Sequence, residues 1–223
     1  MHVIQTFRSL RRDRQGLAML EFALTLPILV PVGLYSIELA NFGITQMKVS
    51  QLALVLADNA SRVGADTSLQ TQELREVDMN DVLQGARLQG QAMGITQTGR
   101  ITVSSIETTN SGGQYIHWQR CVGLKRGANW DSSYGNEGDG KSASYSFTGM
   151  GPAGAKVIAP PGSGVIFVEI NYDYRPLVSN YFIGETRLHH IASFIVRDKR
   201  DFGKGITNPS PAAPRMTCDK YTA

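Results

Sequence analysis

Residues 16–29 of this 223-residue chain read Gly-Leu-Ala-Met-Leu-Glu-Phe-Ala-Leu-Thr-Leu-Pro-Ile-Leu. From Leu17 to Tyr35 the only charged side chain is Glu21. As a helix, this run would extend about 28 Å, close to the hydrocarbon thickness of a bilayer. The sequence therefore predicts one transmembrane helix over residues 17–36.

The charge that precedes the apolar run predicts its orientation. Residues 1–16 contain four arginines and one aspartate. The whole chain has 22 basic and 19 acidic side chains, so the remainder carries 18 of each. A basic leader favours the cytoplasmic side, which would place residues 37–223 outside the membrane. The balanced remainder lacks the clustered positive charge of nucleic-acid-binding proteins, so no nucleic acid is expected as a partner.

A cleavable secretory signal is an alternative interpretation of a basic leader followed by apolar residues. Such a signal ends in a small-x-small triplet, and none is present in Leu-Ala-Asn-Phe at residues 39–42. Glu38 would also lie at an unfavourable place for that cleavage. Glu38 follows Glu21 by about 25 Å along a helix, so we expect it at the outer interface, in contact with solvent.

The carboxylate of Glu21 needs an explanation, because a charge at the centre of a bilayer costs on the order of 3 kcal/mol. If the chain were cut after Gly16, Leu17 would carry a new α-amino group and Glu21 would be the fifth residue. The side chain of Glu21 leans toward the helix N-terminus and could pair with the new amine of Leu17 in the same chain. It could also pair with the amine of a neighbouring subunit that is shifted along the helix axis by about four residues, roughly 6 Å. Alternatively, Glu21 only stabilises the positive end of its helix dipole, by up to about 1 kcal/mol.

The residues Gly16, Leu17, Glu21 and Phe22 resemble the processing site of type IV prepilins. In those proteins a prepilin peptidase cuts after the glycine, and the acid at mature position five serves assembly. The wider stretch, over roughly residues 11–45, resembles TadE-like proteins, the minor pilins or pseudopilins of tight-adherence (Tad) pilus systems. Two shorter stretches also look similar to that family, Trp118-Gln-Arg-Cys-Val-Gly and Tyr172-Asp-Tyr-Arg-Pro-Leu.

This resemblance implies a structural protein of pilus assembly. Gly16 would give the peptidase access, Leu17 would supply the new amine, and Glu21 with Phe22 would serve subunit pairing. The implied partners are a prepilin peptidase, other pilins or pseudopilins, and an inner-membrane assembly platform. The implied location is the bacterial inner membrane, single-pass, with a periplasmic C-terminal domain that could enter an extracellular pilus. The alternative function is an uncleaved membrane-anchored protein that binds a cell-envelope partner.

Beyond the membrane the sequence predicts an α+β head. Apolar residues recur at helical spacing to about Ala60, so the membrane helix should continue as a stem. Asp78 is a candidate N-cap for a second helix. A Gly-rich turn at residues 110–113 predicts a hairpin. Four segments have strand-like patterns and should form an antiparallel sheet packed on both helices, namely residues 100–107, 114–122, 164–174 and 187–197.

Two further segments and two cysteines complete the predicted head. Residues 125–163 are rich in Gly, Ser, Lys and Pro and predict a long surface loop. The Pro-rich residues 207–217 predict an extended arm that carries Cys218 back toward the sheet. Cys121 and Cys218 both fall on the exported side, where oxidation is permitted, so we expect a disulfide, with free buried thiols as the alternative.

No catalytic or phosphate-binding motif stands out in the sequence, so we predict neither enzyme activity nor a cofactor. His189 and His190 would point to opposite faces of a strand, a poor geometry for joint metal ligation. An acidic stretch in the long loop could hold calcium but lacks EF-hand spacing, with Asp131, Asn136, Glu137 and Asp139. Tyr172 and Tyr174 share one strand face, which favours packing over a binding patch. An enzyme with an unrecognised site is the third function considered.

Overall fold

The computed structural model describes residues 15–66, 71–142, 147–197 and 199–223. Most of the basic leader predicted over residues 1–16 lies outside these described residues. The described chain forms two compact units. The first comprises the helix up to Gly43 together with Pro176–Gly184, and the second comprises Ile44–Arg175 together with Glu185–Ala223.

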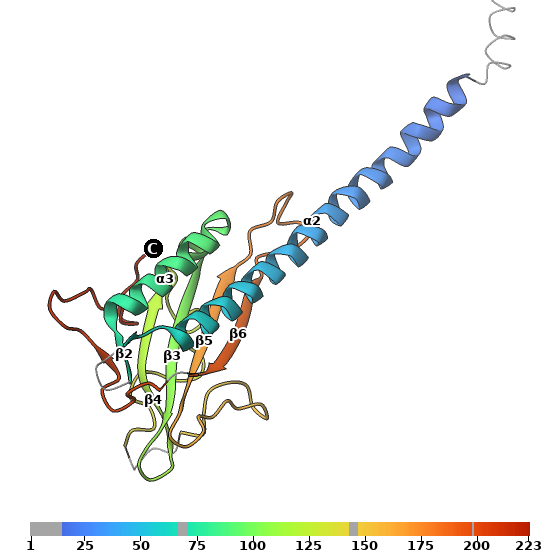
Figure 1. Ribbon diagram of the computed structural model, residues 1–223. Helices are drawn as coiled ribbons and strands as arrows, with labels where there is room; N and C mark the ends of the chain where they lie inside the picture. The colour runs from blue at the N-terminus through green and yellow to red at the C-terminus, as the bar shows by residue number, and fades with distance from the viewer. Residues whose placement is uncertain (1–14, 67–70, 143–146, 198) are drawn as a thin grey trace, which may run out of the picture. The chain divides into compact units, whose positions relative to one another are not determined.

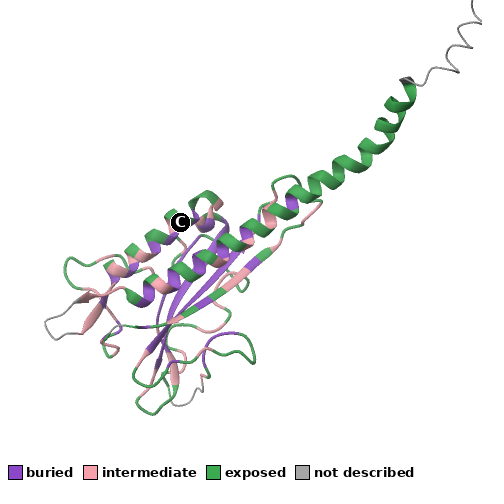
Figure 2. Ribbon diagram, turned by 45° about the vertical axis from the view of Figure 1, so that its right-hand side comes forward, coloured by how far each residue is buried: buried purple, intermediate pink, exposed green. Residues whose placement is uncertain are grey.

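Helix α2, Gln15–Arg62, runs without interruption through Pro27 and Pro31. It begins close to the predicted membrane span and ends two residues beyond the predicted end of the stem, so one continuous helix is confirmed. By length and composition it is able to cross a membrane. Its first part is exposed along its whole length in Figure 2, as every residue from Gly16 to Ile37 is exposed.

Helix α3, Glu76–Gly90, begins two residues before the predicted N-cap, so that prediction was wrong. Asp78 lies inside the first turn, and its carboxylate reaches back to accept the backbone N–H of Arg75 at 3.1 Å. The acid therefore satisfies a free donor at the helix start from within the helix. The 3-10 turn η1, Gln91–Met93, and the short helix α4, Ile95–Thr98, lead from α3 to the sheet.

The main sheet contains β3 Gly99–Thr108, β4 Gln114–Val122, β5 Gly164–Asp173 and β6 Arg187–Ile195. Its order is β4-β3-β5-β6, and every neighbouring pair is antiparallel (Figure 1). All four strands and the hairpin were predicted, with bounds that agree within two residues. The α+β class is therefore confirmed.

A second, small sheet was not predicted. It joins β1 Ala65–Asp66, β2 Gln72–Arg75 and β7 Ile206–Thr207, and the pairing of β2 with β7 is parallel. Strands of two to four residues are too short for a period-two pattern to be recognised. The parallel pair also joins segments far apart in the sequence, which no local signal predicts.

One face of the main sheet is covered by helices, and both α3 and the second part of α2 lie on that side (Figure 1). Nε2 of His190 on β6 is 3.1 Å from Oε1 of Gln46 on α2. The guanidinium of Arg120 on β4 binds the carboxylate of Glu76 at the start of α3. The side chains that α2 buries recur every three or four residues, namely Val49, Leu52, Ala53, Leu56, Ala57 and Ala60.

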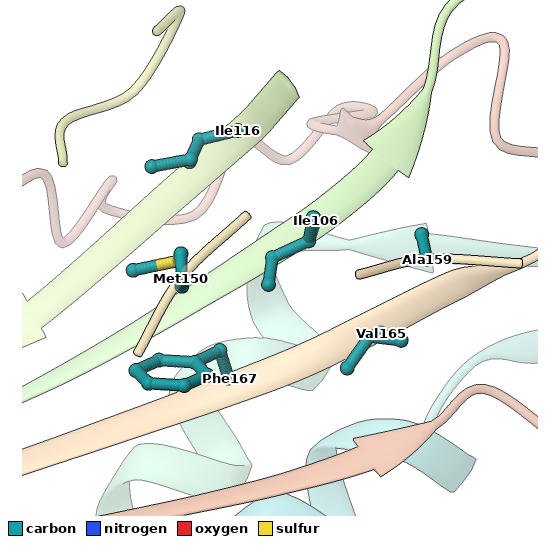
Figure 3. Packing of buried hydrophobic residues seen from close by; sticks show 6 residues of the cluster. All are labelled: Ile106, Ile116, Met150, Ala159, Val165 and Phe167. Carbon is teal, nitrogen blue, oxygen red and sulfur yellow. The ribbon is translucent and has the colours of Figure 1, made fainter. Parts of the chain in front are cut away.

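The opposite face is covered by the long loop, so the prediction that residues 125–163 only run over the surface was wrong. Met150 and Ala159 from this loop are buried in a cluster with four strand side chains, Ile106, Ile116, Val165 and Phe167 (Figure 3). The physical reason lies in the strands, because β3 and β5 are buried along nearly their whole length. Such strands need a cover on both faces. The loop supplies the second cover.

Candidate functional site

The predicted processing residues all lie in the first two turns of α2. Leu17, Glu21 and Phe22 are exposed, and a Cβ at Gly16 would meet no atom within 4 Å. Leu17 and Glu21 are four residues apart, so they lie on one face of the helix, one turn from each other. An α-amino group on Leu17 would therefore lie within one turn of the Glu21 carboxylate.

The apolar surface around these residues is continuous. Every residue of α2 from Gly16 to Ile37 is exposed, and most of these side chains are large and apolar. Near the outer end of the run the ring of Phe182 lies 5.9 Å from that of Tyr35, which still leaves Tyr35 45% exposed. Soluble monomers rarely expose apolar patches beyond a few hundred Å². We therefore expect this surface to be covered by a lipid bilayer, by other helices, or first by one and then by the other.

At the outer end of the apolar run, the expectation that Glu38 is solvated was wrong. Glu38 has 0% of its surface exposed. Its carboxylate accepts the backbone N–H of Leu177 at 3.0 Å and that of Val178 at 2.7 Å. The segment Pro176–Gly184 thus returns to the helix and covers this acid. The partners are about 140 residues apart in sequence, so no local pattern announced the contact.

Cys121 and Cys218 form the predicted disulfide, with Cα atoms 4.8 Å apart. It ties the end of β4 to the C-terminal arm, which we define as residues 216–222. The arm also pairs with the strand end through its backbone, since Met216 and Thr222 accept the N–H groups of Cys121 and Gly123. The arm predicted over residues 207–217 therefore continues beyond Cys218 and packs on the sheet.

Arg100 on β3 is the largest side chain under this arm, and it was not predicted. Its exposure is 0%. The guanidinium donates to the carbonyl oxygens of Gly123, Lys220 and Cys218 at 3.0, 2.8 and 2.5 Å. The ring of Tyr221 lies 4.2 Å from its central carbon. Burial lowers the pKa of Arg100, whereas Asp131 at 3.4 Å opposes that shift. No local sequence signal marks this role, because the partners of Arg100 on the arm lie 118 and 120 residues further along the chain.

Polar side chains on the same face of the main sheet hold the long loop in place. Glu169 accepts the hydroxyl of Ser132 and the N–H of Ser133, both at 3.0 Å. His189 bonds Asn171 at 2.8 Å and Tyr134 at 3.2 Å. His189 therefore faces the loop while its neighbour faces α2, as the strand alternation predicted. Neither arrangement resembles a nucleophile activated by a base.

The acidic residues of the long loop are engaged in local contacts. Asp131 accepts the N–H of Gly127 at 2.8 Å, and Asp139 accepts that of Asn136 at the same distance. Glu137 pairs with Arg120 at 3.1 Å. Among the residues that the structure describes, no group of three His, Cys, Asp or Glu side chains is arranged to hold a metal ion. The calcium alternative thus gains no support.

An open cleft of about 420 Å³ lies beside the disulfide and is lined by both the loop and the C-terminal arm, including Asp131, Ser132, Glu137, Thr217, Asp219 and Tyr221. Its carboxylates already serve the contacts that hold the arm and the loop in place. Tyr172 at the end of β5 is buried and donates its hydroxyl to the carbonyl of Met93 at 3.0 Å. Packing therefore accounts for that tyrosine.

We compared the chain with family models, curated proteins and solved structures, and none of these three comparisons finds a match. The exposed helix end with Gly16, Leu17 and Glu21 is the strongest candidate site in the described chain.

Proposed function

We propose that this protein is a TadE-like minor pilin or pseudopilin that a prepilin peptidase cuts after Gly16 and that acts in the assembly of a Tad or type IV-like pilus. The observation that carries the proposal is the exposed apolar helix with Gly16 and Leu17 at its start and Glu21 one turn further. A peptidase needs access to the first two residues, and a helical stack needs an uncovered apolar face.

The proposed role of Glu21 follows from the energetics of the membrane. An acid in an apolar helix resists burial unless a positive group neutralises it. Cutting after Gly16 would create such a group on Leu17, within reach of Glu21 on the same chain or on a neighbouring one. Subunit association would then neutralise the acid and cover the apolar face in a single step. In this proposal the binding free energy comes from helix packing.

N-terminal sequencing of the mature chain, isolated from cells with an active prepilin peptidase, tests the cleavage. The expected first residue is Leu17. Gly16→Leu should keep the leader, whereas Gly33→Leu should be cut normally. The two glycines are matched, because a Cβ meets no atom within 4 Å at either position. A mature chain that starts elsewhere, or efficient cutting of Gly16→Leu, would refute the proposed processing.

Co-purification with pilin subunits tests the pairing. Glu21→Ala should insert and be cut as the parent is, but should be recovered with partner subunits in reduced amount. Thr25→Ala is a suitable control, since Thr25 is an exposed polar residue of the same helix whose hydroxyl donates to the carbonyl of Phe22 in the preceding turn. Equal recovery of Glu21→Ala and the parent would show that the acid does not pair subunits. A parent that keeps its leader and still functions would favour the uncleaved membrane-anchored protein.

A further inference from the structure

The segment Pro176–Gly184 is attached to α2 through Glu38, as the orange loop beside that helix in Figure 1. Hydrogen bonds from backbone N–H groups to a carboxylate are about twice as strong as those between neutral groups. Glu38 accepts such bonds from two successive residues, Leu177 and Val178. The attachment therefore fixes both the position of the segment along the helix and the direction in which its side chains point.

The attached segment exposes apolar side chains instead of burying them. Leu177 is 67% exposed and Tyr181 is 90% exposed. The ring of Phe182 lies 5.9 Å from the ring of Tyr35 on α2 and 5.9 Å from that of Tyr181. We call the five side chains Tyr35, Leu177, Val178, Tyr181 and Phe182 the aromatic patch. Residues 176–184 contain no charged side chain.

The aromatic patch lies at a defined height on the helix. Tyr35 follows Leu17 by 18 residues, which is about 27 Å of helix axis. When Leu17 lies at one surface of the hydrocarbon layer, Tyr35 lies near the other. The ring of Phe182 is at the same height because it contacts Tyr35. This is the zone in which tyrosine is enriched in membrane proteins, since its ring is apolar and its hydroxyl prefers water.

We propose that the aromatic patch is a membrane anchor that inserts among the phospholipid headgroups at the outer surface of the bilayer. In this role Tyr181 and Leu177 enter the interface, and Glu38 holds them at the height where α2 leaves the lipid. The anchor sets the depth of α2 and opposes its sliding along the membrane normal. This inference requires α2 to span a bilayer, but it requires neither cleavage after Gly16 nor any pilus.

Fluorescence quenching in vesicles tests the anchor directly. The full-length chain carrying Tyr181→Trp is reconstituted into phosphatidylcholine vesicles whose acyl chains are brominated either near the headgroup or near their ends. The emission of the parent, from Trp118 and Trp130, is subtracted. The added tryptophan should emit at shorter wavelength than in water and lose intensity with lipid brominated near the headgroup, because the interface is where aromatic side chains are enriched. Lipid brominated near the chain ends should quench it less.

Two further variants make the result specific. Leu88→Trp places a tryptophan at a 61% exposed leucine of α3 and should show no quenching beyond that of the parent. In the Tyr181→Trp background, Glu38→Ala should reduce the quenching, because it removes the acceptor that holds Leu177 and Val178. Vesicle flotation of each variant confirms that the chain is in the membrane.

Three results would overturn the proposal. Water-like, unquenched emission from Tyr181→Trp in vesicle-bound protein would show that the aromatic patch does not meet lipid. Blue-shifted but unquenched emission that depends on the protein-to-lipid ratio would show that the patch contacts a second copy instead. Equal quenching of Leu88→Trp would indicate general adsorption of the protein to vesicles.

Discussion

Replacing Arg100 with methionine tests how the C-terminal arm, residues 216–222, is fixed to the sheet. Methionine is an unbranched, uncharged side chain that reaches about as far as the Nε of arginine, so it removes the hydrogen bonds while keeping the packing of the aliphatic part. The guanidinium makes three hydrogen bonds to carbonyl oxygens, two of them on the arm, at Cys218 and Lys220. The disulfide from Cys121 holds the same arm independently. Because the hydrogen bonds of Arg100 and the disulfide hold the same arm, the loss of one should change the energetic effect of losing the other.

The magnitudes follow from these contacts. Hydrogen bonds to a charged group contribute about 1.5–3 kcal/mol each, which gives an upper limit of roughly 4.5–9 kcal/mol for three bonds. The desolvation of the buried guanidinium subtracts several kcal/mol from that limit. We therefore expect Arg100→Met to lower the free energy of unfolding by about 3–4 kcal/mol. The disulfide closes a segment of 97 residues, and the loss of a disulfide over about 100 residues costs up to about 4.7 kcal/mol in the chain-entropy model.

Urea unfolding of the full chain in detergent micelles, followed by tryptophan fluorescence, measures both effects, because Trp118 and Trp130 lie in the sheet and its covering loop. The set comprises Arg100→Met, a variant with both cysteines replaced by serine, and the combination. Once either attachment is lost the arm is partly released, so the combined loss should fall short of the sum by about 1–2 kcal/mol. Additivity within about 0.5 kcal/mol would refute the shared-arm reasoning. Arg62→Met, at an exposed arginine paired with Asp58, is the control and should change stability by less than about 0.5 kcal/mol.

Three further predictions concern the head. Glu76→Ala should lower the free energy of unfolding by up to about 3–5 kcal/mol in urea titrations, because it removes the buried carboxylate that binds the guanidinium of Arg120 and leaves the partly exposed Glu137 as its acidic partner. Glu76→Gln should cost less. Met150→Ala should cost about 2–5 kcal/mol by opening a cavity under the long loop, and limited proteolysis should then cut the long loop, residues 125–163, faster than in the parent. Burial, reinforced by the neighbouring charge of His189, lowers the pKa of His190 below its ordinary value of 6.5. As the pH falls, the imidazole of His190 is protonated in the unfolded chain before it is protonated in the folded protein. The free energy of unfolding should therefore be highest above about pH 6.5 and decrease as the pH falls below that value. His190→Asn should make the free energy of unfolding depend less on pH, as measured by urea titrations at a series of pH values.

The regular elements were predictable because their signals are local. The four main strands were recognised from runs and alternations of a few residues, and the hairpin from a Gly-rich turn. Helix α2 was recognised from an uncharged run and a helical repeat. The start of α3 was misplaced because Asp78 acts from inside the helix, and an acid near a helix start is compatible with either position. Cap assignments therefore need the backbone geometry.

The predicted site residues likewise fall into two groups, those placed by local sequence spacing and those placed only by the fold. The relation of Gly16, Leu17 and Glu21 follows from helical spacing alone, so the sequence sufficed to place them on one face. The disulfide was expected from the exported location of two cysteines, but its geometry required the fold. The buried environment of Glu38 was missed because its covering segment lies 139 residues further along the chain.

The sequence by itself determined a single apolar helix with one acid near its start, followed by an α+β head, because hydrophobic length and periodicity are properties of neighbouring residues. Only the tertiary structure decided which side chains are buried by distant segments. The three cases are Met150 in the cluster between the sheet and the long loop, Arg100 under the C-terminal arm, and Glu38 under residues 176–184. In each, the stabilising contact joins backbone or side chains that are brought together only when the chain closes a long loop, and no local pattern encodes such a closure.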